Sequence, residues 1–267
     1  MKVAEATGNR EEPEGDVKAG ERYQEGTDLF TAGRYLEAIH AFEEALAARP
    51  REARYLVALG AAVDRLGFFS QARELCDQAA EVSPLSPDVW FMRGLALYRL
   101  GRYGSAESCL EQAVKLLPGH AEAWFIRGNC HYQAGEIEES LACFDRVLAI
   151  SPRYPKALYN RGVSLADLGR FDEAVEAYNA CLSMNPGVAI VLTNLGVSLA
   201  NLGRYDDAVR YFEESLEIDP RDPAAWHDKG LALSKLGRDE EAMACFERFR
   251  ELSRSRPSQD IDLRPFR

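Results

Sequence analysis

The fragment GRYLEA, residues 33–38, decides the fold because close copies of it return at regular distances along the chain. GRYGSA occupies residues 101–106 and GRYDDA occupies residues 203–208, which lie 68 and 170 residues further on. Both distances are multiples of 34. A fixed period of roughly 20–50 residues is the sequence signature of a protein built from stacked structural repeats.

Prolines extend the same period along the chain. Six of them lie 34 residues apart: Pro50, Pro84, Pro118, Pro152, Pro186 and Pro220. Counting back from them defines seven repeats without insertions: 19–52, 53–86, 87–120, 121–154, 155–188, 189–222 and 223–256. In the seventh repeat, Arg254 occupies the proline position. We number positions within a repeat from its first residue.

Glycine occupies positions 8 and 15 of all seven repeats, and a small residue occupies position 20. Glycine at position 15 is suited to end a helix in the left-handed conformation, and proline at position 32 stops a second helix. Position 1 is proline in three repeats, and Ser86 and Asp222 precede two of these prolines as candidate N-caps. Each repeat is therefore predicted to be one helix, a tight turn and a second helix.

Glycine at position 8 lies within the first predicted helix, where it costs about 1 kcal/mol relative to alanine. Its presence in every repeat predicts close approach of the two helices. One helix pair cannot bury its apolar faces alone, so the pairs are expected to stack on their neighbours. The expected fold is all-α, a right-handed α-solenoid superhelix of antiparallel helix pairs. Residues 1–18 are expected to be a disordered N-terminal segment, and residues 257–267 a C-terminal tail.

The amino-acid composition and charge disfavour several classes of function. The net charge of −11 disfavours nonspecific binding to nucleic acid, and the sequence contains no apolar run long enough to insert into a membrane. The N-terminus lacks the apolar core of a secretory signal, and the six cysteines form no CxxC pair. A cytoplasmic protein with reduced thiols, without metal or other cofactor, is expected.

Two stretches carry a resemblance to a known family. They are LYNRGVSLADLGRFDEAVEAYNACLSMNP (158–186) and LTNLGVSLANLGRYDDAVRYFEESLEIDP (192–220). Their pattern, L-x2-L/R-G then A-x3-F/Y then P, resembles the tetratricopeptide repeat (TPR), and the resemblance covers residues 19–256. It implies a superhelix whose concave groove binds extended peptides. A 35-residue RNA-reading helical repeat is the nearest alternative, which the constant period and the negative charge disfavour.

The first helix of each repeat has two faces. At 100° per residue, positions 4, 7, 8 and 11 form the core stripe, and positions 2, 5, 9, 12 and 13 lie roughly opposite. The resemblance implies that the second face lines the groove. Aromatic residues recur there at position 5 or 12 in four of the first five repeats, which favours a partner-binding surface, although the rings are equally suited to pack between adjacent helices.

Asparagines add a second feature of this face, because an amide can both donate to and accept from a peptide backbone. The resemblance implies such a use for Asn129, Asn160 and Asn194. The candidate peptide-binding residues are Tyr23, Phe91, Tyr98, Phe125, Asn129, Tyr132, Tyr159, Asn160 and Asn194. The cations of the family's two-carboxylate clamp are missing, so capture of an acidic chaperone tail is not expected. The remaining charges of this face, Asp64 among them, are expected to be solvated.

No phosphate-binding, dinucleotide-binding or HExxH motif is present, and the four histidines are scattered. We therefore expect a noncatalytic scaffold or adaptor that binds a protein or peptide ligand. Two alternatives remain open at this point. One is a structural protein that self-assembles through its last repeat as a homo-oligomer, and the other is a substrate-recruiting subunit of a separately encoded enzyme.

Overall fold

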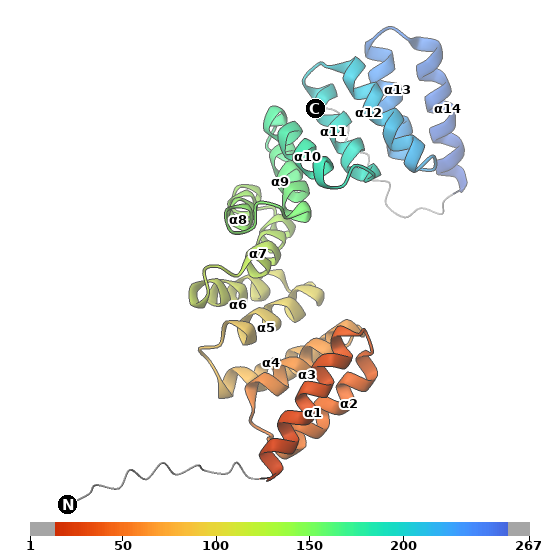
Figure 1. Cartoon of the computed structure of the whole chain (residues 1–267). Helices are drawn as coiled ribbons and strands as arrows, with labels where there is room; N and C mark the ends of the chain where they lie inside the picture. Colours follow the sequence, from red (N-terminus) through yellow and green to blue (C-terminus); the bar gives the residue numbers. More distant parts are fainter. Residues whose placement is uncertain (1–13, 256–267) are drawn as a thin grey trace, which may run out of the picture. The chain divides into compact units, whose positions relative to one another are not determined.

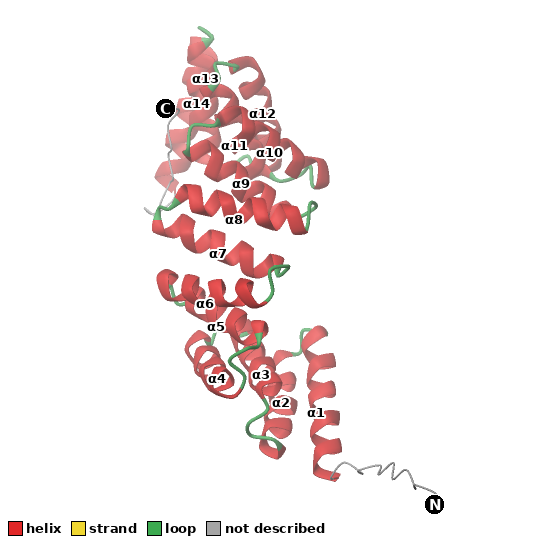
Figure 2. Ribbon diagram, turned by 90° about the vertical axis from the view of Figure 1, so that its left-hand side faces the viewer, coloured by secondary structure: helices red, strands yellow, loops and turns green. Residues whose placement is uncertain are grey.

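The computed structural model describes residues 14–255, which form two compact units, residues 14–130 (the N-terminal unit) and residues 131–255 (the C-terminal unit). All secondary structure in the described residues is helical (Figure 1, Figure 2). The helices are α1 (Glu14–Thr31), α2 (Tyr35–Ala48), α3 (Ala53–Arg65), α4 (Phe69–Val82), α5 (Pro87–Arg99), α6 (Tyr103–Leu116), α7 (Ala121–Ala134), α8 (Ile137–Ile150), α9 (Pro155–Asp167), α10 (Phe171–Met184), α11 (Ala189–Asn201), α12 (Tyr205–Ile218), α13 (Pro223–Lys235) and α14 (Asp239–Ser255). The α7 helix contributes its first ten residues to the N-terminal unit and its last four to the C-terminal unit.

The helix boundaries follow the 34-residue frame. In repeats 2–7 the first helix starts at position 1, and in all seven repeats the second helix starts at position 17. Within each unit consecutive helices pack as antiparallel pairs, so the predicted all-α class is confirmed.

One boundary was predicted wrongly. Residues 14–18 were expected to be disordered, but they form the first turns of α1, and Ala19 is buried among Tyr55 and Ala45. Residues 1–13 and the tail 257–267 lie outside the described residues.

The glycine at position 15 ends the first helix as predicted. All seven of these glycines have positive φ, for example Gly101 at 71° and Gly135 at 80°. The next residue then donates its backbone N–H back into the helix, as Arg102 does to the carbonyl of Leu97 at 2.9 Å. A side chain at Gly101 would be strained in this conformation, so the turn requires glycine.

The glycine at position 8 permits the predicted close approach of the two helices. A Cβ atom at Gly162 would lie 2.5 Å from the ring of Tyr178, which is buried at position 24 of the same repeat. At Gly60 the opposite residue is the smaller Cys76, and a Cβ atom would lie 3.3 Å from its Sγ. The glycine therefore leaves room for the large residue at position 24 that fills the centre of most repeats.

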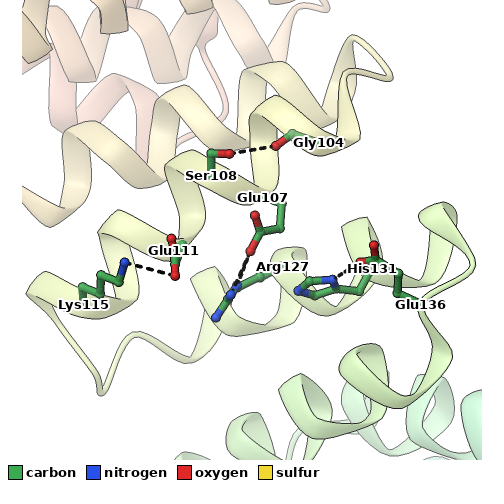
Figure 3. A network of polar contacts seen from close by, with 8 residues as sticks. All are labelled: Gly104, Glu107, Ser108, Glu111, Lys115, Arg127, His131 and Glu136. Carbon is green, nitrogen blue, oxygen red and sulfur yellow. Dashed lines mark hydrogen bonds and ion pairs between the residues drawn. The ribbon is translucent and has the colours of Figure 1, made fainter.

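A tryptophan, a cation and a carboxylate join neighbouring repeats. The Nε1 of Trp124 donates to the Pro118 carbonyl at 3.0 Å, and the Arg127 guanidinium lies 5.4 Å from the centre of the Trp124 ring. Arg127 also donates to Glu107 of the preceding helix through Nε and Nη2, at 2.9 and 2.8 Å (Figure 3). The same arrangement recurs with Trp90, Arg93 and Asp77, and with Trp226, Lys229 and Glu213. These contacts fix the register of the third, fourth and seventh repeats on the repeat before each of them.

Of the two predicted helix caps, only one forms. Asp222 Oδ1 accepts from the backbone N–H of Ala224 at 3.0 Å, whereas Ser86 makes no side-chain cap. The last helix keeps Met243 exposed, and Phe246 and Phe249 are half-buried beside His227. No helix among the described residues is long and apolar enough to cross a membrane.

Candidate peptide-binding surface

We call the surface formed by positions 2, 5, 6, 9, 12 and 13 of the first helix of each repeat the A face. In the N-terminal unit its aromatic rings pack on other rings. Tyr23 stacks on Tyr55 with ring centres 4.9 Å apart, and the guanidinium of Arg54 lies 5.5 and 5.0 Å from the centres of these two rings. Tyr55 is fully buried and Tyr23 is half-buried, so one edge of the Tyr23 ring remains accessible.

The other predicted rings of this unit differ in exposure. Tyr98 is half-buried beside Tyr103, with ring centres 5.6 Å apart, and burial raises the pKa of its phenol. Phe125 is also half-buried. Phe91, by contrast, is only 8% exposed and packs on His120. The alternative interpretation, a ring packed between helices, therefore describes Phe91, whereas Tyr98 and Phe125 present part of their surface.

In the C-terminal unit hydrogen bonds hold the predicted rings. The hydroxyl of Tyr132 donates to Asp167 Oδ2 at 2.8 Å, and the Nδ2 of Asn194 donates to the hydroxyl of Tyr159 at 3.1 Å. Each bond joins the first helix of one repeat to the first helix of the next. All four of these side chains are half-buried, which leaves polar and aromatic edges accessible while their orientation is fixed.

Asn129 and Asn160, the other two predicted amides, are half-buried as well. The nine predicted residues are divided between the two units. It places Tyr23, Phe91, Tyr98, Phe125 and Asn129 in the N-terminal unit, and Tyr132, Tyr159, Asn160 and Asn194 in the C-terminal unit.

One expectation about this face was wrong. Asp64 was expected to be solvated, but it is only 6% exposed, and its Oδ1 has no hydrogen-bond partner among the described residues. Burial raises the pKa of this carboxyl, and the positive charges of Arg99 and Arg65 oppose that shift. No pattern in the repeat columns distinguishes this aspartate from a surface one, because its burial depends on how α3 packs against α5.

Buried polar groups further along the chain were also missed by sequence reasoning. Thr193, at position 5, shares a hydrogen bond of 2.8 Å with Ser215, which also donates to the Ala189 carbonyl at 3.0 Å. Asp228 is 6% exposed, and burial raises the pKa of its carboxyl although His227 Nδ1 lies 3.0 Å from its Oδ1. The sequence feature that could have indicated a more polar interior is the small or polar residue at positions 5 and 12 of the last two repeats, where most earlier repeats carry aromatic rings.

Most histidine and cysteine side chains within residues 14–255 are held by hydrogen bonds or by burial. His131 is nearly buried and bonds through Nδ1 to Glu136 Oε2 at 2.6 Å (Figure 3). All six cysteines lie within the described part of the chain, where each is buried and none forms a disulfide. Burial raises the pKa of the Cys76 thiol to about 12, which opposes formation of a reactive thiolate. Across residues 14–255 no group of histidine, cysteine and acidic side chains is arranged to hold a metal ion.

The stacked helix pairs and their glycine corners define a helical-repeat protein. Patterns of the tetratricopeptide repeat family match residues 23–88, 57–107 and 91–155, and further residues 153–221 and 187–255. The chain belongs to the tetratricopeptide repeat family. Proteins of this family bind other proteins or peptides through their repeats.

Solved structures support the same fold. YrrB, described as a TPR protein with an unusual peptide-binding site, is 20% identical, with a TM-score of 0.64 over 71% of this chain and 97% of YrrB. MamA from Desulfovibrio magneticus RS-1 is 19% identical, with a TM-score of 0.62 over 64% of this chain and 97% of its own. MamA AMB-1 is 26% identical, with a TM-score of 0.58 over 67% and 97%. No curated protein sequence matches the chain.

Proposed function

We propose that this protein is a noncatalytic scaffold or adaptor whose A face binds an extended peptide or a segment of a partner protein. The observation that carries the proposal is the way the rings of Tyr132 and Tyr159 are held. Their hydroxyls are hydrogen-bonded to Asp167 and Asn194, so the rings are oriented before a ligand arrives while part of each stays accessible. Preorganised groups lose less conformational entropy on binding, which favours affinity.

Backbone recognition by amides supports the same surface. Asn160 and Asn194 occupy position 6 of successive repeats, and Asn129 occupies position 9 of the repeat before them. Half-buried amides in series suit the regularly spaced N–H and C=O groups of an extended peptide. The peptide-binding site described for YrrB is a precedent in the same fold. Phe91 is too deeply buried to contact a ligand, so we assign it a supporting role behind Tyr98 and Phe125.

The rival hypothesis of head-to-tail self-assembly fits the charges poorly. At three inner junctions a carboxylate at position 25 pairs with a cation at position 7 of the next repeat, as in Asp145 with Arg161 at 2.6 Å. A second copy stacked in register on α14 would place Glu247 opposite Glu25, which have the same charge. Like charges at such a junction oppose association.

Peptides selected from a display library against the full chain test the proposal. We expect the combined change Tyr98→Ala, Phe125→Ala and Asn160→Ala to weaken binding of the selected peptides by about tenfold or more, because interface aromatics contribute most of the binding energy. The matched control changes three exposed residues of the second helices, Glu43→Ala, Glu176→Ala and Glu214→Ala, and is expected to bind normally. Equal affinity of both triple variants, with both shown to be folded by circular dichroism, would exclude the A face as the binding site.

A further inference from the structure

Position 16, at the corner between the two helices, is arginine in five repeats. Four of these arginines bond to a carboxylate three residues later, at position 19: Arg34 to Glu37, Arg170 to Glu173, Arg204 to Asp207 and Arg238 to Glu241. Most of these pairs are forked, with both Nε and Nη2 engaged. In the third repeat position 19 is Ser105, and the Arg102 guanidinium makes no hydrogen bond or ion pair with any described residue.

A second arginine of the same corner also lacks the partner that its equivalent has. Arg65, at position 13 of the second repeat, donates through Nε and Nη2 to the hydroxyl of Tyr35 at 3.2 and 2.9 Å. Arg99 occupies position 13 of the third repeat, and the residue equivalent to Tyr35 is Phe69, which has no hydroxyl. Arg99 is exposed, and its guanidinium has no hydrogen bond or ion pair within residues 14–255.

The surroundings of these two arginines are apolar as well as positive. Arg99 and Arg102 flank the turn at Gly101, and the preceding corner carries Phe68, whose side chain is 56% exposed. The buried carboxylate of Asp64 interacts with Arg99 electrostatically and not through a hydrogen bond. The chain has a net charge of −11, and four of its five arginines at position 16 are paired with a carboxylate of the same repeat. The unpaired guanidinium groups of Arg99 and Arg102 depart from that pattern. We call Phe68, Arg99 and Arg102 the arginine corner.

We propose that the arginine corner docks an acidic segment of a partner protein, with carboxylates on Arg99 and Arg102 and an apolar side chain on Phe68. This inference rests on the proposed function and specifies the chemistry of part of the ligand. Guanidinium groups bind carboxylates through two parallel hydrogen bonds, and three paired corners of this chain, those of Arg34, Arg170 and Arg238, show that geometry internally. A partner carboxylate would supply the acceptor that Ser105 and Phe69 do not.

The sequence itself offers a test that leaves both arginines in place. Ser105→Glu gives Arg102 the carboxylate that its equivalents have, and therefore competes with an acidic ligand. Probes are fluorescein-labelled peptides rich in glutamate, each with one phenylalanine at a different spacing, titrated with the full chain. We expect Ser105→Glu to weaken binding about threefold to fivefold and Arg99→Glu with Arg102→Glu about tenfold or more, because exposed ion pairs are individually weak.

Matched controls separate this effect from general charge. Ser105→Gln adds a side chain of similar size without charge, and Arg170→Glu reverses an arginine that already has its carboxylate, Glu173. Both are expected to bind the acidic peptides as the unmodified chain does. Binding should also weaken with added salt, and peptides with glutamine in place of glutamate should not bind.

Several results would overturn the proposal. These are no binding of any glutamate-rich peptide, equal binding to the charge-reversed corner, binding that requires phosphorylated peptides, and binding that the glutamine peptides share. If peptides selected on the whole chain still depend on Tyr98, Phe125 and Asn160, any of these results removes the acidic docking site and leaves the proposed function intact.

Discussion

The two compact units are built from the same repeat, yet their A faces are stabilised differently. In the N-terminal unit rings contact rings and arginines, as Tyr23 does with Tyr55 and Arg54. In the C-terminal unit rings are held by hydrogen bonds to the next first helix, as Tyr132 is by Asp167. The repeat specifies which positions form the core and the corner and leaves the A face free to change its chemistry.

The same comparison applies inside the repeats. Glycine at position 8 leaves space for a large residue at position 24, and Tyr178 fills that space over Gly162 in the C-terminal unit. In the N-terminal unit Cys76 fills this place over Gly60 with a smaller side chain. The two repeats therefore reach the same backbone arrangement with cores of different tightness, and two glycine substitutions test that difference.

The largest effect is expected where the core is tightest. Gly162→Ala would place a Cβ atom 2.5–2.9 Å from three atoms of the buried Tyr178 ring. We expect the free energy of unfolding to fall by about 2 kcal/mol, since overpacking costs more than the helix gains from alanine. The midpoint of urea unfolding, followed by circular dichroism, measures the loss.

Gly60→Ala is the matched substitution in the N-terminal unit. Its Cβ atom would meet Cys76 Sγ at 3.3 Å, a contact that a small shift relieves, while alanine favours the helix by about 1 kcal/mol. We expect the midpoint of unfolding to stay within error or rise. If both substitutions destabilise equally, the size of the residue at position 24 does not control the packing of the repeat.

A smaller effect is expected from the hydrogen bonds of the A face. Tyr132→Phe removes the donor to Asp167 and should lower the free energy of unfolding by about 1 kcal/mol. Tyr98→Phe removes a hydroxyl for which the structure gives no hydrogen bond, so its stability should change little. Chemical unfolding of both variants measures the difference, and an equal loss in the two would contradict the distinction between the units.

Sequence alone predicted the fold closely because each repeat column has a local cause. The glycine corner, the helix starts and the proline stop depend on backbone conformation within a few residues, and Gly101 and Pro155 have the predicted roles. The extension of α1 back to Glu14 was missed because these residues precede the periodic pattern.

The candidate site was less predictable. Whether a ring at position 5 is buried, as Phe91 is, or half-buried, as Tyr159 is, depends on the residues of the next repeat. Contacts such as Asn194 with Tyr159 join side chains 35 residues apart, and no column shows them. The missing partner of Arg102 could have been predicted from the sequence, because Ser105 occupies position 19, which is acidic or glutamine in every other repeat.

The smallest expected effect concerns the two buried carboxylates, one in each unit. Burial raises the pKa of Asp64 above its ordinary value of 3.8. Because the folded-state pKa lies above the unfolded-state value, the ionised carboxylate lowers stability at neutral pH, and this penalty disappears as the pH falls through the folded-state pKa. Asp64→Asn should therefore raise the free energy of unfolding at neutral pH, by less than about 1 kcal/mol because Arg65 and Arg99 already offset the cost.

The advantage of Asp64→Asn should vanish near the ordinary carboxyl pKa of 3.8, where both proteins carry an uncharged group. Asp228 is the matched residue, since burial raises its pKa too, but His227 lies within hydrogen-bonding distance of its Oδ1. Asp228→Asn should therefore gain less at neutral pH than Asp64→Asn, because it replaces a carboxylate that already has a partner. Urea midpoints of the three proteins across this pH range measure the difference. A stabilisation by Asp64→Asn that does not change with pH would show that ionisation of the buried carboxylate is not its cause.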